Sequence, residues 1–287
     1  MEKPTIAIIG AGRLGSTLAL ALAQRGFPLN LCDGDPAALA SAADRVGASL
    51  ASADPIQAAQ GAEIVMLTLP DDGIKPVAEQ LAGAQALARG RVLCHCSGFL
   101  SSGVLVSNKM LGVATASFHP LASFPGRLAA WDDYRGIWFG IEGDAPALAQ
   151  IRELAAALEC RTVEIKSGQK PLYHAAGVLA SNYLVALVGE AKALMEASGV
   201  GGQAQELVLS LASSVINNLG TRGIEGSLSG PIARGDTQTV GGHLEAIKAK
   251  HPHSEGVYRA LGLILAEMVE CREGRGVRQE IIKMLKG

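Results

Sequence analysis

Short apolar runs alternate with helical patterns along the N-terminal part of the chain, up to about Ile165. Each run is apolar over its whole length, which is typical of strands in a parallel sheet covered by helices on both faces. The pattern therefore predicts a doubly wound α/β domain over residues 1–166. The expected strands are Ile6–Ile9, Leu29–Cys32, Ile64–Leu69, Val92–His95, Val113–Phe118, Ile137–Ile141 and Thr162–Ile165.

Beyond residue 166 the pattern changes to long segments rich in alanine and leucine, with no clear strand. These segments predict an all-helical second domain over residues 167–287, beginning with one unusually long helix, Leu172–Ser198. The Gly-, Ser- and Pro-rich stretch Thr221–Thr237 is expected to be a loop, and a loop of that length is usually functional. The other expected helices are Gln203–Asn218, Val240–Lys250, Ser254–Glu273 and Gly276–Leu285.

A glycine-rich string joins the first expected strand to the helix that follows it. Gly10 permits a tight turn, Gly12 lets the backbone approach a pyrophosphate, and Gly15 lets the helix pack closely on the sheet. The helix N-terminus adds N–H groups and the positive end of its dipole. The context predicts a Rossmann domain that binds a dinucleotide, with a ligand-free turn as the alternative. The expected cofactor-binding residues of the string are Gly10, Gly12, Arg13, Leu14 and Gly15.

Asp33 ends the second expected strand, about 20 residues after the last glycine of the string. A carboxylate at this point accepts hydrogen bonds from the adenosine ribose and would repel a 2′-phosphate. Gly34 and Asp35 follow, where NADP enzymes usually carry a basic residue, so NAD is the preferred cofactor. Arg13 could still contact a phosphate, which leaves NADP open. The alternative for Asp33–Asp35 is a plain solvated turn.

Several expected strands end in polar or special residues, which should gather at one edge of the sheet, where doubly wound folds bind ligands. Leu69, Pro70 and Asp71 are expected beside the cofactor. Ser97 and Gly98 are expected to hold a substrate carboxylate, with a helix-capping Ser97 as the alternative. The adjacent Cys94–Cys96 side chains alternate between faces, so no metal site is expected there.

Two histidines are candidate proton donors. His119 ends a strand before Pro120, which favours an extended conformation at the rim. His174 lies in the first turns of the long helix, and Ser181 and Asn182 follow two turns later on nearly the same face. Unpartnered buried polar groups cost about 1–3 kcal/mol each, so this polar stripe indicates a cleft or partners. His174 with Asn182 is the expected catalytic pair and His119 the competing donor. A structural role is the alternative for each histidine.

The string Ser229–Thr237 is the second unusual segment of the chain. Arg234 offers a planar fork that matches a substrate carboxylate or phosphate. Asp236 is expected to take part in substrate binding by orienting Arg234, or to cap the following helix. A capped helix entry with an exposed arginine is the alternative.

Composition narrows the classes of function. The net charge is −2 and basic residues form no cluster, so we expect neither nucleic acid nor an anionic membrane surface as a partner. No uninterrupted apolar stretch reaches the ~18 residues that span a bilayer. The five cysteines have no paired spacing and indicate reduced thiols in a cytoplasmic protein.

Several of these strings together resemble one family, the Rossmann-like proteins that carry the domain of unknown function 2520, often labelled NADP oxidoreductases. The resemblance covers nearly the whole chain. Its most specific parts are His-Cys-Ser-Gly and Gly-Pro-Ile-Ala-Arg-Gly-Asp. The matching segments are Gly10–Gly15, Leu69–Asp72, His95–Gly98, Phe118–Leu121, Tyr173–Asn182 and Gly230–Asp236.

The wider relatives are the 6-phosphogluconate dehydrogenase-like enzymes, in which a Rossmann domain precedes a helical domain that often dimerises. The resemblance implies an NAD(P)-dependent oxidoreductase, a homodimer through its helical domain, acting on a small carboxylated oxo or hydroxy compound, as ketopantoate reductases do. Such enzymes carry a catalytic lysine where this chain has His174, and Lys170 lies one turn earlier. Imine or prephenate-like substrates, and a non-catalytic sensor or scaffold that binds the dinucleotide, are the alternatives.

Overall fold

The computed structural model describes residues 3–274 and 278–287, which form two compact units, Met1–Ala180 and Ser181–Gly287. The expected boundary at 166/167 precedes helix α7 (Lys170–Ala180). That helix lies within the first unit, and its first residue, Lys170, donates a hydrogen bond to Ser117 of the sheet. We call the two parts the sheet unit and the helical unit.

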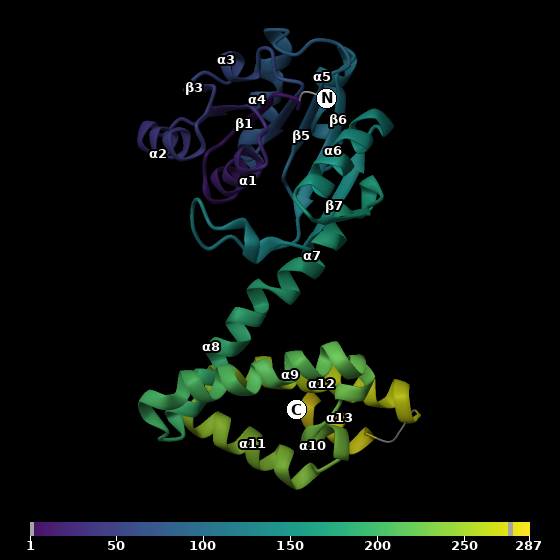
Figure 1. Ribbon diagram of the computed structural model, residues 1–287. Helices are drawn as coiled ribbons and strands as arrows, with labels where there is room; N and C mark the ends of the chain where they lie inside the picture. The colour runs from purple at the N-terminus through teal and green to yellow at the C-terminus, as the bar shows by residue number, and fades with distance from the viewer. Residues whose placement is uncertain (1–2, 275–277) are drawn as a thin grey trace. The chain divides into compact units, whose positions relative to one another are not determined.

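The sheet unit contains one eight-stranded sheet in the order β3-β2-β1-β4-β5-β6-β7-β8 (Figure 1). Neighbouring strands run parallel, except that β7 is antiparallel to β6. This confirms the expected doubly wound α/β class. The strands are β1 (Ile6–Ile9), β2 (Leu29–Cys32), β3 (Leu50–Ser52), β4 (Ile64–Leu67), β5 (Val92–His95), β6 (Ala114–Pro120), β7 (Trp138–Gly143) and β8 (Arg161–Glu164).

The observed sheet differs from the prediction in one extra strand and in the direction of one strand, and the local sequence pattern specifies neither. Strand β3 was not expected, because it is a short edge strand whose Leu50 and Ala51 are exposed. The chain from β6 to β7 holds only a short 3₁₀ turn, η2 (Trp131–Tyr134). A parallel return needs a long crossover, usually a helix, so β7 pairs with β6 in the antiparallel sense.

Helices cover both faces of the sheet (Figure 1). Alternate residues of β1 point to opposite faces, so Ile6 and Ile8 belong to one apolar cluster, and Ala7 and Ile9 belong to the other. The first cluster includes α1, α2 and α6, and the second includes α3 and α4. The helices of this unit are α1 (Arg13–Gln24), α2 (Pro36–Val46), α3 (Pro55–Ala59), α4 (Asp71–Gly83), α5 (Val106–Met110), α6 (Ala145–Ala157) and α7.

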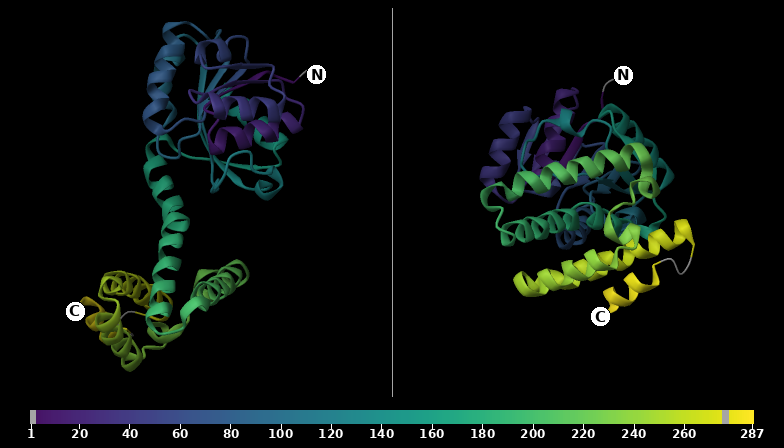
Figure 2. Two further views of the ribbon diagram at one scale, coloured as in Figure 1. Left: turned by 90° about the vertical axis from the view of Figure 1, so that its left-hand side faces the viewer. Right: turned by 90° about the horizontal axis from the view of Figure 1, so that it is seen from below.

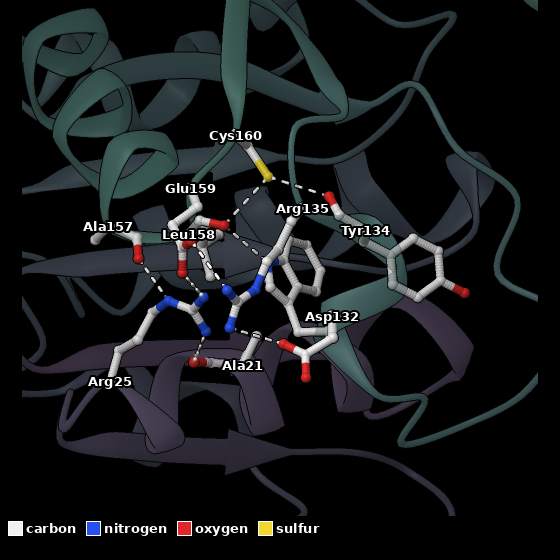
Figure 3. A network of polar contacts seen from close by, with 10 residues as sticks. Ala21, Arg25, Asp132, Tyr134, Arg135, Ala157, Leu158, Glu159 and Cys160 are labelled. Atoms are coloured by element: carbon white, nitrogen blue, oxygen red, sulfur yellow. Dashed lines mark hydrogen bonds and ion pairs between the residues drawn. The ribbon is translucent and has the colours of Figure 1, made fainter.

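A polar network joins the end of α1, the turn η2 and the end of α6 (Figure 3). Arg25, which ends α1, donates to the Ala157 carbonyl at 2.5 Å and pairs with Glu159 at 2.9 Å. Arg135 pairs with Glu159 at 3.3 Å and with Asp132 at 2.9 Å. The network therefore holds α1, η2 and the end of α6 together.

The helical unit consists of α8 (Asn182–Ala197), α9 (Ala204–Ser227), α10 (Gly230–Arg234), α11 (Thr237–Lys250), α12 (Glu255–Glu273) and α13 (Gln279–Lys286). A short turn, η4 (Gly201–Gln203), joins α8 and α9 into a hairpin (Figure 2). The buried core of the unit comes from α10 to α13, with Ile232, Val240, Leu244, Ala266, Ile281 and Leu285. The expected C-terminal helix begins at Gly276, which lies outside the described residues.

Two expectations for this part of the chain are wrong. The single helix predicted over Leu172–Ser198 is two helices, because Ser181 has a non-helical backbone with φ −123° and ψ −75°. The loop predicted over Thr221–Thr237 is mostly helical: α9 runs on to Ser227, bends at Gly223 with φ 70°, and α10 follows. Glycine and proline there mark a bend and a helix start instead of a loop.

The stretch Ser167–Ala197 has the length and apolar composition of a membrane-crossing helix, which the count of uninterrupted apolar residues did not detect. Apolar core helices that cross no membrane share this length and composition. The stretch is interrupted at Ser181, and near its start Lys170 is buried and bonded to the sheet. An apolar helix with an exposed face also suits association with another protein chain.

Candidate active site

The glycine-rich loop has the shape that its sequence predicted. Gly10 has φ +107°, and a Cβ there would lie 2.7 Å from the Thr68 carbonyl oxygen. A Cβ on Gly15 would lie 1.8 Å from the Gly10 oxygen, so α1 packs directly on the loop. A Cβ on Gly12 would meet nothing within 4 Å, so the loop is open at the residue where a pyrophosphate would approach. Arg13 is exposed, and Leu14 packs against the core.

Gly12 is the N-cap of α1 and has no side chain to occupy the first N–H groups. The residues that follow, Arg13 and Leu14, carry no negative charge. These N–H groups and the positive end of the helix dipole therefore suit an anion. The residues present thus fit the pyrophosphate of a dinucleotide.

Asp33 lies at the end of β2 and is fixed by two backbone hydrogen bonds. Its Oδ2 accepts the N–H of Ala11 at 2.5 Å, and its Oδ1 accepts the N–H of Asp35 at 2.8 Å. The carboxylate is therefore anchored against the glycine-rich loop, beside the expected ribose position. Asp35 caps α2 by accepting the N–H of Ala37 at 2.9 Å. Asp35 thus behaves as a helix cap, while Asp33 both closes the turn and contacts the glycine-rich loop.

Arg127, which the sequence did not single out, lies near this point. Its guanidinium is 3.9 Å from the Asp35 carboxylate, and both groups are half exposed. The loop that carries Arg127 is held on α1, because the N–H groups of Leu128 and Ala129 donate to the hydroxyls of Ser16 and Thr17 at 3.0 and 3.2 Å. No basic residue follows Asp33 in the sequence, but Arg127, from a loop distant in sequence, places a positive charge beside the same turn.

The residue triplet after β4 lies next to the glycine-rich loop. Thr68 donates its hydroxyl to the Gly10 oxygen at 2.6 Å, and a Cβ on Gly10 would lie 3.1 Å from the Leu69 side chain. Pro70 then leads into α4, whose first residue is Asp71. The expected cofactor-side residues Leu69, Pro70 and Asp71 thus follow a strand that pairs directly with β1.

His95 shapes the loop after β5 from inside the protein. Its side chain is fully buried; Nδ1 accepts the N–H of Ser97 at 3.2 Å, and Nε2 lies 3.2 Å from the Ser101 oxygen. Because Nδ1 is an acceptor, we infer that Nε2 carries the proton and donates to Ser101. Burial, with the nearby Lys170 charge acting in the same direction, lowers the pKa of His95 to about 4. His95 is therefore neutral and structural.

Ser97 is bonded within the same loop. Its hydroxyl oxygen accepts the N–H groups of Phe99 at 3.1 Å and Leu100 at 2.9 Å. The hydroxyl therefore closes a turn of its own loop. Because the next helical turn, η1 (Ser102–Leu105), begins after Ser101, Ser97 is not a helix N-cap, and its role in binding a substrate carboxylate stays a prediction. Its carbonyl oxygen accepts a hydrogen bond from Lys170 at 2.8 Å.

Lys170 lies at the centre of the site, although its sequence position did not single it out as a site residue. Its side chain is 2% exposed, and its ammonium donates to the Ser97 oxygen and to the hydroxyl of Ser117 on β6. Burial lowers the pKa of Lys170 to about 8, against the opposing attraction of the nearby Glu142 carboxylate. The lysine therefore ties the first turn of α7 to the ends of β5 and β6.

His119 and His174 converge on Gly98. A Cβ at Gly98 would lie 2.5 Å from His174 Nδ1 and 2.8 Å from His119 Nε2. The two rings are edge-on, with centroids 5.9 Å apart. Only glycine at position 98 leaves room for both imidazoles, and neither histidine is fully exposed. The structure thus brings together three expected site residues from the loop after β5, from β6 and from α7.

Tyr173 holds His119 from the other side. Its hydroxyl lies 3.1 Å from His119 Nδ1, and the backbone N–H of Gly140 is bonded to the same oxygen. Since the tyrosine oxygen accepts from Gly140, we infer that its hydroxyl donates to Nδ1, which leaves the His119 proton on Nε2, facing Gly98. Burial lowers the pKa of His119 to about 4, with the Lys170 and His174 charges acting in the same direction.

The remaining expected residues belong to the helical unit. Asn182 begins α8, is exposed, and its Oδ1 accepts the Ser181 hydroxyl at 3.0 Å. The predicted stripe requires His174 and Asn182 to lie on one continuous helix. The break at Ser181 separates them into two helices. Arg234 is exposed at the end of α10. Asp236 accepts the N–H of Thr239 at 3.0 Å and so caps α11, as its alternative interpretation predicted.

Comparisons with known proteins agree with this architecture. A Rossmann-like domain model matches residues 2–120, and the model of the domain of unknown function DUF2520 matches residues 137–264. The chain thus combines the two domains that the sequence resemblance named, and that resemblance is confirmed. No curated protein matches the sequence.

Solved structures share the fold over nearly the whole chain. A Thermotoga maritima protein is 28% identical with a TM-score of 0.71, covering 93% of this chain and 99% of its own. A Bacteroides fragilis protein, provisionally named an NADP oxidoreductase, is 22% identical with a TM-score of 0.75, covering 92% and 98%. An imine reductase from Myxococcus stipitatus in complex with NADP⁺ is 18% identical with a TM-score of 0.70, covering 99% and 100%.

Proposed function

We propose that this chain is an NAD(P)-dependent oxidoreductase that reduces the carbonyl or imine group of a small carboxylated compound, or catalyses the reverse reaction. The observation that carries the proposal is the convergence of His119 Nε2 and His174 Nδ1 on Gly98. Strand β4 pairs with β5 on one side and with β1 on the other. The residues expected beside the cofactor follow β4, and the glycine-rich loop follows β1. The oxidoreductase names of several similar structures support the class of reaction.

The glycine-rich loop and Asp33 would hold the cofactor, and its nicotinamide supplies the hydride when bound. The protein must then supply a proton and stabilise charge on the reduced atom. His174 is the proposed proton donor, because its Nδ1 faces Gly98 and an imidazole can transfer a proton to a reacting group. Its ring packs edge-on against His119, which fixes its orientation.

His119 is proposed as a hydrogen-bond donor that stays neutral. Its lowered pKa, about 4, means that it carries no net charge near pH 7 and is a poor proton source. Its Nε2–H faces Gly98 once Tyr173 has donated to Nδ1. Such a preorganised donor stabilises developing negative charge on a carbonyl oxygen. His119 and His174 therefore have different tasks.

Lys170 is proposed as a positioning residue. Its ammonium holds the Ser97 carbonyl and the Ser117 hydroxyl, and thereby the loop that presents Gly98. Its buried positive charge also favours an anionic substrate in the sheet unit. This supports a small carboxylate, either a 2-oxo acid, as for a ketopantoate reductase, or a cyclic imine carboxylate. The role of Arg234 in binding the substrate carboxylate stays a prediction. So does the role of Asn182 as a partner of His174.

The choice between NAD and NADP turns on two groups. Asp33 lies where a carboxylate favours NAD, which is our preferred cofactor. Arg127, 3.9 Å from Asp35, places a guanidinium beside the same turn, where it could bind a 2′-phosphate. The ratio of kcat/KM for NADH and NADPH in the wild type and in Arg127→Ala distinguishes the two effects.

The experiment that tests the function is oxidation of NADH and NADPH against a panel of 2-oxo acids and cyclic imines. We expect turnover with one member and a loss of about 10²–10⁴-fold in kcat for His174→Ala. His243→Gln, a histidine in the helical unit, is the matched control and should be neutral. Unchanged turnover in His174→Ala would refute the proton-donor role. Cofactor binding without any turnover would favour the sensor alternative.

We infer further that the protein is a homodimer through its helical unit and that it is cytoplasmic. Large apolar side chains are exposed on the α8–α9 hairpin, for example Val185 at 74%, Leu211 at 62% and Ile216 at 52%. The core of the unit comes from α10 to α13 and leaves this hairpin face uncovered. An apolar surface of this kind is usually buried by a partner, and a second copy is the partner that the family resemblance implies.

A further inference from the structure

We propose that the helical unit contains a binding site for a divalent transition-metal ion, formed by Glu190, His251 and His253. Glu190 lies on α8, and the two histidines flank Pro252 at the junction of α11 and α12. One ligand atom from each side chain lies within 4.8 Å of the other two. The three residues all belong to the helical unit, and the proposed reaction does not use them.

The donor set points to the class of ion. Two imidazole nitrogens and one carboxylate oxygen are the ligands that Zn²⁺ and its neighbours Co²⁺ and Ni²⁺ prefer, whereas Mg²⁺ and Ca²⁺ favour oxygen ligands alone. A tetrahedral Zn²⁺ with bonds of about 2.0–2.2 Å holds its ligand atoms roughly 3.3–3.6 Å apart. The ligand atoms therefore need to close by at most about 1.5 Å, and the exposed His253 side chain has room to rotate toward the other two. Three protein ligands leave one position for water or another ligand.

Ser254 prepares two of the ligands for metal binding. It is 2% exposed, its hydroxyl donates to Glu190 Oε2, and its oxygen lies 2.8 Å from His251 Nδ1. Since the serine proton goes to the carboxylate, His251 must donate its Nδ1–H to the serine oxygen. The lone pair of His251 is then on Nε2, and the ring orientation is fixed. A second group that fixes the tautomer of a ligating histidine is a regular feature of metal sites.

The backbone brings the two histidines together. His251 follows the last residue of α11 with φ −151° and ψ 62°, outside the helical region that is disfavoured before a proline. The 3₁₀ turn η5 (Pro252–Ser254) then returns the chain, so that the rings of His251 and His253 have centroids 3.7 Å apart. A shared cation would bind both rings through ring nitrogens. A bound ion would link α8 to the α11–α12 junction.

The test uses the full-length protein without a histidine tag, stripped with a chelator, in a Cys271→Ser background because that thiol is exposed. Calorimetry with Zn²⁺ should show one equivalent per chain, and Co²⁺ should give the visible absorption of a low-symmetry site. Zn²⁺ should also raise the Tm. His253→Gln should weaken binding at least tenfold, and Ser254→Ala should weaken it by about 10–100-fold.

His243→Gln is the matched control, because His243 lies on α11 and bonds Tyr258 at 2.8 Å, outside the cluster. It should leave the Zn²⁺ affinity unchanged. His253 is exposed, so its substitution should not unfold the protein, and circular dichroism checks this. The proposal is overturned if Zn²⁺ binds without defined stoichiometry, or if His253→Gln and Glu190→Gln bind it as tightly as the parent protein. Each outcome is read from binding, so it is independent of catalytic turnover.

Discussion

Replacing Gly98 by alanine tests the geometry of the proposed site most directly. The added Cβ would lie 2.5 Å from His174 Nδ1 and 2.8 Å from His119 Nε2. Non-bonded heavy atoms prefer about 3.5–4.0 Å, so the imidazoles must retreat by roughly 1 Å. Overpacking of this kind costs about 1–3 kcal/mol of stability.

A displacement of about 1 Å in a catalytic group can lower the rate by about 10²-fold. We therefore expect kcat/KM of Gly98→Ala to fall by about that factor, measured by steady-state oxidation of the reduced cofactor. Cofactor affinity, measured by calorimetry, should stay unchanged, because the glycine-rich loop is untouched. Gly83→Ala is the control, since a Cβ there meets nothing within 4 Å.

A thermodynamic cycle separates a local clash from general unfolding. In a His174→Ala background the nearer clash is absent, so Gly98→Ala should cost clearly less stability than in the wild type. A kcat/KM of Gly98→Ala within twofold of the wild type, or an equal stability cost in both backgrounds, would refute a clash with the two imidazoles.

Three further predictions follow from other parts of the structure. Burial lowers the pKa of Lys170 from 10.5 to about 8, so between these pH values the unfolded chain binds more protons and the free energy of unfolding should rise with pH. In urea titrations, Lys170→Met should remove this slope of up to about 1.4 kcal/mol per pH unit. An unchanged slope would contradict the burial of the ammonium. Arg127→Ala should raise KM for NADPH at least tenfold relative to NADH if its guanidinium binds the 2′-phosphate; equal effects on both cofactors would exclude that contact. Leu211→Glu with Ile216→Glu should convert a dimer into monomers in light scattering, whereas exposed Glu206→Gln on the same helix should not; a wild-type monomer would refute the proposed interface.

The parts of the site that depend on local sequence could be predicted. Gly10, Gly15 and Asp33 lie where the glycine spacing and the strand end placed them, because turn geometry is set by neighbouring residues. The convergence of Gly98 with His119 and His174 could not be predicted as a contact, although each residue was a candidate. It depends on the pairing of β5 with β6 and on the packing of α7.

Lys170 and Arg127 show why long-range contacts escape a sequence argument. Lys170 was discounted because it lies one turn before the position where relatives carry a lysine, yet burial and Ser97 define its role. Arg127 reaches the Asp35 turn through a loop with no periodic pattern. The break at Ser181 also has no glycine or proline to announce it. In each case the deciding partner is distant in sequence or the local signal is absent.

The position of α7 in the chain has a consequence for synthesis on the ribosome. The glycine-rich loop, Asp33 and the residues after β4 are all made before residue 72, whereas Lys170, Tyr173 and His174 follow the last strand, β8. Domains fold vectorially as the chain emerges, N-terminal part first. The dinucleotide half of the sheet is thus made before the side chains that would perform the chemistry. Nascent protein would meet its cofactor before it becomes competent to turn over.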